Sequence, residues 1–334
     1  MKISKSQTLI TGVYRTGSEY LTLLLGTHPE LHTSMYRVNV LRFMYHRYDP
    51  INLPENQRKA LEDLNHRLHE RYEMKVDTEG ILRQAANTPG FDYGNLYNLI
   101  MSNLYLSNRV EHWAEKVQLM WREIPVFLEM MPNGRAVHIL RDPRAVLASF
   151  KRYTNHPYPA CLGAIFNCFD AMKSALEHRQ VFGDYVRFIR YEDLVADPES
   201  VINGIWKFLG LLTGYSLDQG GWKDAYGKAW HSNSSFHENS PHDAFDTKRT
   251  LHGWRDVLTV EEIIFTEHVC GEMMRCFDYE PEGESFPIAE LESFIQKDRR
   301  IAGYYENWKR FGLGIEQFPA DPLDQSTWEK ANND

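Results

Sequence analysis

Apolar and polar positions near the start of the chain follow a strand, a turn, a helix and a second strand. Residues 8–13 form a short β-rich apolar run that breaks at Gly12, and residues 21–25 continue as an apolar helix. Residues 31–35 predict another short strand. Residues 52–74 are densely charged and carry leucines at helical spacing, which predicts an amphipathic helix.

The middle of the chain predicts a helical region followed by a buried strand. Apolar positions in residues 78–131 indicate several shorter helices, separated at 88–90 and at Pro125. Residues 136–140 are apolar except for His138 and predict a buried strand. Pro143 then stands where the first turn of a helix tolerates proline. The helical region has the character of an insertion that shapes a pocket.

The second half continues the alternation of strands and helices. Residues 160–179 predict a helix, and residues 185–191 predict a strand that leads into a helix ending near Leu209. Alternation of this kind indicates an α/β fold with a central parallel sheet flanked by helices.

The remaining segments predict loops and two helices. Residues 213–250 are rich in Gly, Ser, Asn, His and Trp with weak periodicity, so we expect long loops that form a mobile lid. Helices are expected at 259–277 and at 288–308, followed by a polar tail. No break in composition marks a domain boundary, so we expect a single domain.

Composition narrows the class of protein. The chain has 334 residues, 43% of them hydrophobic, which supports a sizeable core. Its 46 acidic and 37 basic side chains give a net charge of -9, which argues against a nucleic-acid binder that relies on bulk attraction. The apolar run near the N-terminus is too short for a signal peptide, and no segment reaches the ~18 apolar residues of a membrane span. We expect a cytoplasmic protein without a membrane partner.

Cysteines and histidines give no metal signature. The fourteen histidines are scattered and form no H-E-x-x-H motif, so we expect no metal. No cysteine pair has C-x-x-C spacing, and we expect buried, reduced thiols at Cys161, Cys168, Cys270 and Cys276.

Two segments carry the chemistry, and each follows a predicted strand and opens a predicted helix. Residues 12–19 have the glycine spacing of a Walker A loop, but Ser18 and Glu19 stand where its lysine and hydroxyl belong. A phosphate-binding turn with Arg15 at its apex remains. The second segment, residues 140–150, has the same strand-to-helix context. Two such sites indicate a ligand with two phosphates.

These segments resemble a known family. Arg15-Thr16-Gly17-Ser18, followed by an aromatic residue and a leucine, resembles the 5′-phosphosulfate loop of sulfotransferases that use 3′-phosphoadenosine 5′-phosphosulfate (PAPS). Residues 141–149 are similar to their 3′-phosphate motif. Residues 190–199 and the basic loop at 248–255 match in the expected order. The chain is therefore identified as a member of the PAPS-dependent sulfotransferases, of a bacterial small-molecule type.

The resemblance implies a P-loop-like sulfotransferase fold over one domain, residues 1–334. Its core would span about 7–279, a helical acceptor-pocket insertion about 50–120, and a C-terminal extension about 281–334. It also implies transfer of a sulfuryl group from PAPS to a hydroxyl or amine of a small-molecule acceptor, such as a secondary metabolite. PAP (3′-phosphoadenosine 5′-phosphate) would be the product, and no metal would take part.

The resemblance also assigns residues to roles. Arg15 would stabilise charge on the bridging oxygen of the departing phosphate. The residues implied to bind the cofactor are Arg15, Thr16, Gly17, Ser18, Glu19, Tyr20, Arg141, Ser149, Tyr191, Lys248 and Arg249. Two neighbours receive structural roles instead: we expect Arg144 to be an exposed residue of a first helical turn and Trp254 to be a packing residue.

The assignment of the general base depends on the alignment of a single proline. If Pro125 aligns with the family's conserved proline, Glu123 takes the position of the base. The alternative for Glu123 is a solvated acid or a salt bridge to Arg122. His32, Glu30 and His112 are possible substitutes.

Glu19 is the main departure from the family, which usually has a second threonine there. A carboxylate directed at a phosphate is repelled. Glu19 therefore either pairs with Arg15 or another basic neighbour, or contacts a cationic acceptor. Together with Glu123 it suggests an alkaloid-like acceptor.

Two other function classes compete with this interpretation. One is a P-loop nucleotide kinase, which the missing Walker lysine disfavours. The other is a catalytically degenerate protein that binds a nucleotide without turnover, which Glu19 keeps open. A partial dimer motif at 255–260 lacks its glutamate, because Ile264 stands in that place, so the oligomeric state stays open.

Overall fold

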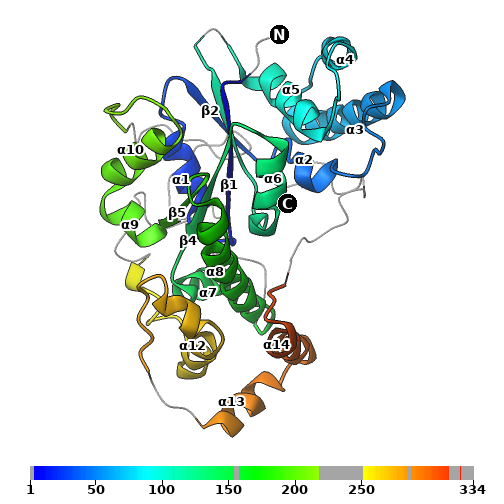
Figure 1. The fold of residues 1–334 in the computed structure, drawn as a ribbon. Helices are drawn as coiled ribbons and strands as arrows, with labels where there is room; N and C mark the ends of the chain where they lie inside the picture. The colour runs from blue at the N-terminus through cyan, green and yellow to red at the C-terminus, as the bar shows by residue number, and fades with distance from the viewer. Residues whose placement is uncertain are drawn as a thin grey trace.

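The computed structural model describes residues 4–107, 109–153, 158–217, 251–283, 287–315 and 324. Within these residues a five-stranded sheet has the order β2-β3-β1-β4-β5, and every neighbouring pair is parallel (Figure 1). The strands are β1 (Ser6–Gly12), β2 (Leu31–Met35), β3 (His112–Lys116), β4 (Gly134–Leu140) and β5 (Val186–Arg190). The predicted α/β fold with a central parallel sheet is confirmed.

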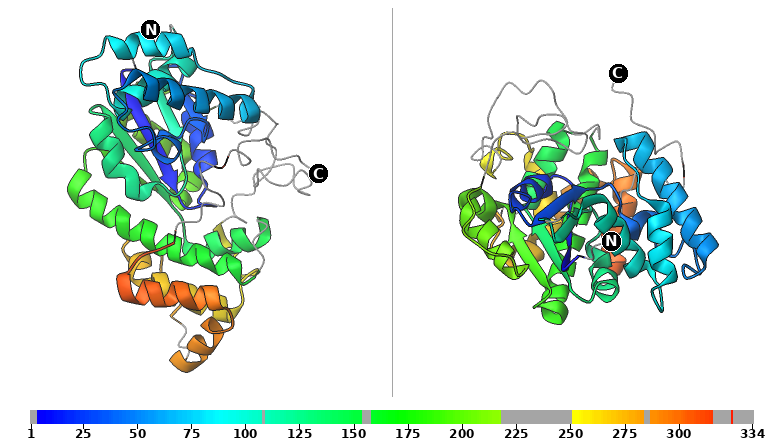
Figure 2. Two further views of the ribbon diagram at one scale, coloured as in Figure 1. Left: turned by 90° about the vertical axis from the view of Figure 1, so that its right-hand side faces the viewer. Right: turned by 90° about the horizontal axis from the view of Figure 1, so that it is seen from above.

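Helices surround this sheet. Those that follow the strands directly are α1 (Ser18–Leu25), α2 (Val40–Phe43), α6 (Ile124–Met130), α7 (Pro143–Tyr153), α9 (Tyr191–Ala196) and α10 (Pro198–Phe208). The others are α3 (Pro54–Tyr72), α4 (Thr78–Ala86), α5 (Tyr93–Tyr105), α8 (Gly163–Phe182), α12 (Val260–Arg275), α13 (Ile288–Ile295) and α14 (Arg299–Phe311), with short 3-10 turns at Trp121–Glu123 and Ala160–Leu162. Helices α3 to α5 gather at one end of the molecule and α12 to α14 at the other (Figures 1 and 2).

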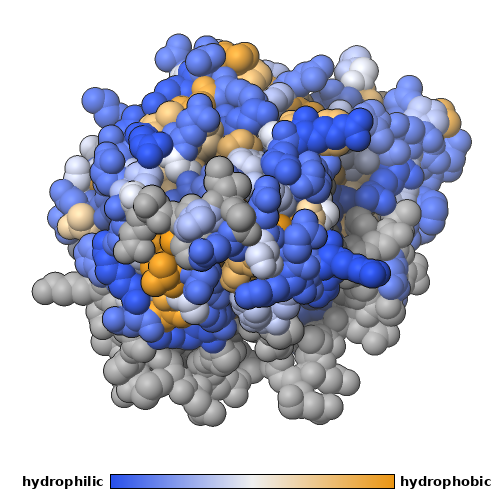
Figure 3. Space-filling view, turned by 90° about the horizontal axis from the view of Figure 1, so that it is seen from below, coloured by the Kyte–Doolittle hydropathy of each residue, from blue (hydrophilic) through white to orange (hydrophobic). Residues whose placement is uncertain are grey.

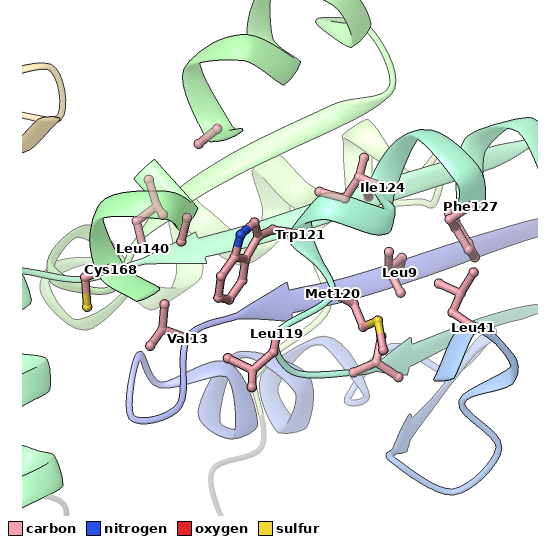
Figure 4. Packing of buried hydrophobic residues seen from close by; sticks show 14 of the residues in the cluster. Leu9, Val13, Leu41, Leu119, Met120, Trp121, Ile124, Phe127, Leu140 and Cys168 are labelled. Carbon is pink, nitrogen blue, oxygen red and sulfur yellow. The ribbon is translucent and has the colours of Figure 1, made fainter. Parts of the chain in front are cut away.

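Both faces of the sheet are buried, as a parallel sheet requires. Leu9 and Ile10 are adjacent on β1, and each is fully buried in a different hydrophobic cluster. The cluster with Ile10 includes side chains of α1, α9 and α10, whereas the larger cluster with Leu9 includes those of α3, α5, α6 and α8 (Figure 4). Because both faces are buried, these strands are found in the sequence as mostly apolar runs and not as an alternation of apolar and polar residues.

Strand β3 corrects the prediction of an all-helical region at 78–131 and of a helical insertion at 50–120. It pairs with β1 on one side and with β2 on the other, in the interior of the sheet. Its last two residues, Glu115 and Lys116, are both fully buried. Charged residues at buried positions hide the apolar run by which the other strands were found.

Two predicted helices are broken by aspartate caps. The helix predicted to reach Leu209 divides at Asp197, whose side chain accepts a hydrogen bond from the Ser200 N–H at 3.0 Å. The helix predicted at 288–308 divides where Asp298 caps the N-terminus of α14. Capping aspartates favour a new helical start over continuation. The predicted loops at 213–250 lie outside the described residues from 218 onward.

Surface and thiols complete the description. None of the helices in the described residues combines the length and apolar character needed to span a membrane. The face drawn in Figure 3 is mostly hydrophilic, with small hydrophobic areas between polar side chains. Cys161, Cys168 and Cys270 are buried free thiols, as predicted, but Cys276 is exposed, because it lies just past the end of α12.

Candidate active site

The carboxyl ends of the parallel strands meet at one edge of the sheet, where open α/β sheets bind their ligands. Predicted and unpredicted polar residues meet here because each directly follows or ends a strand. Arg15 follows β1, Tyr36 follows β2, Lys116 ends β3, Arg141 follows β4 and Tyr191 follows β5.

The turn between β1 and α1, residues 13–17, is held in a conformation that suits an anion. Arg15 and Gly17 have positive φ angles of 71° and 85°, and the Thr16 hydroxyl donates to the Val13 carbonyl at 2.8 Å. Gly17 is the N-cap of α1, and no side chain caps that helix. Its first-turn N–H groups and the positive end of its dipole therefore face a prospective phosphate.

Tyr191 lies directly beneath this phosphate loop. A Cβ atom added to Gly17 would lie 2.3 Å from the Tyr191 ring, so only glycine fits there. The ring also faces the Arg141 guanidinium, whose carbon lies 4.5 Å from the ring centroid. Tyr20 lies close enough for its pKa to be raised by burial and by the phenol of Tyr191. Tyr191 therefore contacts both Gly17 of the loop and the guanidinium of Arg141.

The two phosphate-type motifs are in direct contact. Arg15 Nε donates to the Ser149 hydroxyl at 3.0 Å, and a terminal nitrogen of Arg141 donates to the Arg15 carbonyl at 2.7 Å. The sequence predicted both motifs as the two ends of one ligand. The structure brings Arg15, Arg141 and Ser149 into one site, and with them the rest of residues 16–20.

Glu19 pairs with a basic neighbour, which is one of the outcomes expected for it. Its Oε1 accepts a hydrogen bond from Lys116 Nζ at 2.9 Å. The Tyr36 hydroxyl donates to the same oxygen at 3.4 Å and also to Gln118 Oε1. Gln118 in turn donates to the Ser18 hydroxyl at 3.2 Å. The carboxylate is thus part of a network that includes the phosphate loop.

Lys116 is the most unusual member of this network. Its side chain is fully buried, and its ammonium lies 3.9 Å from the centroid of the Tyr36 ring and in hydrogen-bond contact with the Tyr36 hydroxyl. Burial lowers the pKa of Lys116 to about 8, against the opposing effect of the Glu19 carboxylate. Burial also raises the pKa of the Tyr36 phenol well above its ordinary value. Tyr36 therefore stays protonated and acts as a donor.

Glu115 holds the loop that places Tyr36. Its carboxylate accepts hydrogen bonds from the backbone N–H groups of Val38 and Asn39, at 2.7 and 2.9 Å, and from the Tyr97 hydroxyl. Burial raises its pKa, and these donors oppose the effect. Adjacent charged residues on β3 therefore serve two functions: one fixes the loop after β2, and the other pairs with Glu19.

The three possible substitutes for the base, Glu30, His32 and His112, lie at the opposite edge of the sheet. His112 pairs in register with Ser6 at the start of β1, and Leu31 of β2 aligns with the same His112, which puts Glu30 and His32 at the amino edge too. Burial lowers the pKa of His32 to about 4. These three residues are therefore remote from the phosphate loop.

Glu123 ends the 3-10 turn Trp121–Glu123, which leads from β3 into α6. From Trp121 to Phe127 the chain runs back along the sheet, away from Val13 (Figure 4). The pKa of Tyr45 is raised mainly by burial and further by the negative charges of Glu129 and Glu123. Arg122, predicted as an alternative partner, forms an ion pair with Asp170 at 2.8 Å.

Arg144 corrects a prediction. It is buried rather than exposed, because it forms ion pairs with Asp142 at 2.8 Å and with Glu267 at 2.7 Å. Trp254 is buried, as predicted, with the guanidinium carbons of Arg144 and Arg255 at 4.3 and 4.2 Å from its ring. The predicted cofactor residues Lys248 and Arg249 lie outside the described residues.

Sequence reasoning missed Lys116, Tyr36 and Gln118. The sequence offers one signal for them: Lys116 and Gln118 stand two positions apart and are followed by Leu119, a few residues before Pro125. That signal is informative only once β3 is recognised as a strand. Without the strand, nothing places Lys116 at the same edge as Arg15.

Comparison with known proteins identifies the family of the chain. A sequence profile described as "Sulfotransferase family" matches residues 8–213. Carbohydrate sulfotransferase 7 of Mus musculus is 32% identical over 100 residues, which cover 30% of this chain and 20% of that protein. The match thus spans far less than two thirds of this curated relative.

Solved structures share the fold. The sulfotransferase domain of the Synechococcus PCC 7002 olefin synthase superposes with a TM-score of 0.52 at 20% identity, covering 86% of this chain and 98% of that one. The sulfotransferase domain from the curacin biosynthetic pathway gives 0.53 at 19% identity, covering 84% and 99%. With a family profile over more than half of its length and this fold, the chain belongs to the sulfotransferase family.

Proposed function

We propose that this protein transfers a sulfuryl group from PAPS to a hydroxyl or amine of a small-molecule acceptor. The observation that carries the proposal is the contact between the two phosphate motifs: Arg15 Nε lies 3.0 Å from Ser149 Oγ, and Arg141 donates to the Arg15 carbonyl. A ligand with phosphates at both ends suits loops that meet in this way. The bound donor would supply the activated sulfuryl group.

Residues of the chain would divide the work of binding and charge stabilisation. The first turn of α1, from Ser18 to Tyr20, presents backbone N–H groups to the 5′-phosphosulfate, and the left-handed Gly17 lets the ligand approach. Arg141 and Ser149 would bind the 3′-phosphate. Arg15 would stabilise the negative charge that develops on the departing phosphate. Glu123, predicted from the sequence as the general base, is one of two candidate carboxylates for that role, and Glu19 is the other.

A carbohydrate hydroxyl is a second candidate acceptor. It is favoured by the name of the 32% identical relative, a carbohydrate sulfotransferase, although that match covers 30% of this chain. The expectation of a cationic acceptor rests on Glu19 and Glu123. Since Glu19 is paired with Lys116, only Glu123 still supports it. We also propose a cytoplasmic location, as expected from the sequence.

Transfer from radiolabelled PAPS tests the function. Purified protein is incubated with a panel of phenols, alcohols, amines and oligosaccharides, with EDTA present. We expect a labelled product without added metal, and PAP binding in calorimetry. A parallel incubation uses labelled ATP with Mg²⁺ and no EDTA; phosphate transfer there, without sulfate transfer from PAPS, would support a kinase. Tight PAP binding without any transfer would support a degenerate binding protein.

A further inference from the structure

We propose that Glu19 is the general base of this sulfotransferase, accepting the proton of the acceptor while Lys116 and Tyr36 hold its carboxylate in place. The inference rests on the proposed function and deepens it. It assigns a role to the residue that departs most clearly from the family pattern.

Position in the fold is the first argument. Glu19 stands in the first turn of α1, one residue after Ser18 and two after the N-cap Gly17. A group bound at that helix end is therefore within reach of its side chain. Its side chain is 24% exposed, whereas the Lys116 side chain behind it is 0% exposed. The lysine thus approaches the carboxylate from the protein interior, and the open side of Glu19 faces solvent.

Charge is the second argument. An isolated carboxylate beside a phosphosulfate would be repelled by several negative oxygens. The Lys116 ammonium, 2.9 Å from Glu19 Oε1, compensates that charge in a buried setting where screening by salt is weak. The pair is close to neutral, so the phosphate loop can hold both a carboxylate and an anionic donor.

Geometry of the network is the third argument. Lys116 donates to Oε1 of Glu19 at 2.9 Å, and the Tyr36 hydroxyl, whose single proton is shared with Gln118, lies 3.4 Å from the same oxygen. The ammonium and the phenol on one side of the carboxyl group restrict its rotation and hold it in place for proton transfer. Tyr36 keeps its own proton, since burial raises its pKa well above the ordinary value. The carboxylate is therefore the proton acceptor of this cluster.

The chemical step balances without another reactant. The acceptor oxygen forms a bond to sulfur as its proton passes to the Glu19 carboxylate. The bond between sulfur and the bridging oxygen breaks, and its electron pair stays on the departing phosphate beside Arg15. In the reverse direction, protonated Glu19 returns the proton to the leaving oxygen.

The test compares Glu19→Gln in two reactions. In the forward reaction with an alcohol acceptor, we expect kcat to fall about 10²- to 10⁴-fold, the usual contribution of a general base. In the reverse reaction, 4-nitrophenyl sulfate donates its sulfuryl group to PAP, and nitrophenolate leaves as a stable anion that needs no proton. Here we expect Glu19→Gln to stay within about 3-fold of wild type, a margin small beside the loss of a general base.

A purely structural role gives a different result. If Glu19 only compensates Lys116, Glu19→Gln slows both directions alike, and Glu19→Gln with Lys116→Met restores the stability and the forward reaction together. Either outcome would overturn the proposal, as would a forward reaction that depends on Glu123→Gln but not on Glu19→Gln. The exposed Glu79, which pairs with Arg58 on the surface, provides the matched control Glu79→Gln.

Two further readouts separate this inference from the proposed function. Affinity for PAP, measured by calorimetry, should change less than about 3-fold in Glu19→Gln, well below the loss expected in kcat. The acidic limb of the kcat profile should disappear in that variant, because the carboxyl group that must lose its proton is gone. Among the described residues, the titratable groups of Lys116 and Tyr36 contact Glu19. Wild-type protein that neither binds PAP nor transfers sulfate overturns both ideas, whereas normal forward turnover by Glu19→Gln overturns the inference alone.

Discussion

Arg15 Nε donates to the Ser149 hydroxyl at 3.0 Å, which joins the phosphate loop after β1 to helix α7 after β4. The two residues are 134 positions apart in the sequence. A ligand bound at the loop after β4 would therefore also affect Arg15. Because Arg15 would stabilise the charge on the departing phosphate, changes at Arg15 should affect turnover more than affinity for PAP.

Exchange of Arg15 for alanine should reduce kcat for sulfate transfer about 10²- to 10³-fold, the usual cost of removing one preorganised charge from a transition state. Steady-state kinetics with labelled PAPS measure the effect. Arg58→Ala, at an exposed arginine on α3, should leave kcat unchanged. Undiminished transfer by Arg15→Ala with PAP still bound would show that the role of Arg15 is wrong.

Exchange of Gly17 for alanine should abolish measurable PAP binding. The new methyl group would lie 2.3 Å from the Tyr191 ring, at a φ of 85°. Gly210→Ala is the matched control, because Gly210 has a φ of 75° with no atom within 4 Å of an added Cβ. It should cost only about 1–2 kcal/mol of left-handed strain. Calorimetric titration with PAP and urea unfolding of both variants distinguish the collision from the strain.

Stability should depend on pH through Lys116. Its pKa is lowered from 10.5 to about 8, so between these values the unfolded chain holds a proton that the folded chain has lost. The free energy of unfolding therefore rises with pH in this window, by at most about 1.4 kcal/mol per pH unit. Urea unfolding from pH 7 to 10.5 should show this rise in wild type and its loss in Lys116→Met. Parallel profiles would contradict the prediction.

His138 should destabilise the protein in acid. It is fully buried on β4, neither ring nitrogen has a hydrogen-bond partner in the part of the chain that the structure describes, and burial lowers its pKa to about 3. As the pH falls from 6.5 towards 3, only the unfolded chain gains the proton, so stability declines. His138→Leu should remove this decline and add about 1–3 kcal/mol by eliminating an unsatisfied polar group.

The measurement for His138→Leu is urea unfolding at pH 7 and pH 5. The gain in the free energy of unfolding should be larger at pH 5. His69→Leu, at an exposed position near the end of α3, is the control for replacing a histidine that is not buried. An equal gain at both pH values for His138→Leu would mean that this histidine titrates normally.

Local patterns were enough to predict most of the fold and the phosphate loops. Residues 31–35 and the turn around Gly17 were predictable because apolar runs and glycine spacing are properties of neighbouring residues. Lys116 was not, because the partners that make its burial tolerable, Glu19 and Tyr36, are 97 and 80 positions away. Arg144 was misjudged for the same reason, since Glu267 is 123 positions distant. Charged residues that are satisfied by long-range partners have no local pattern.

The adjacent burial of Glu115 and Lys116 restricts how β3 can pair. Successive residues of a strand face opposite sides, so a slip of one residue would move each charge into the place of its neighbour. A slip in one direction would put Glu115 in the place of Lys116, where its carboxylate would meet Glu19. A slip in the other direction would put Lys116 in the place of Glu115, where its ammonium would meet the backbone N–H groups of Val38 and Asn39, which are donors like itself. Both misplacements are repulsive. The two charges thus destabilise a misaligned sheet. The candidate active site is assembled only when β3 pairs in the correct register.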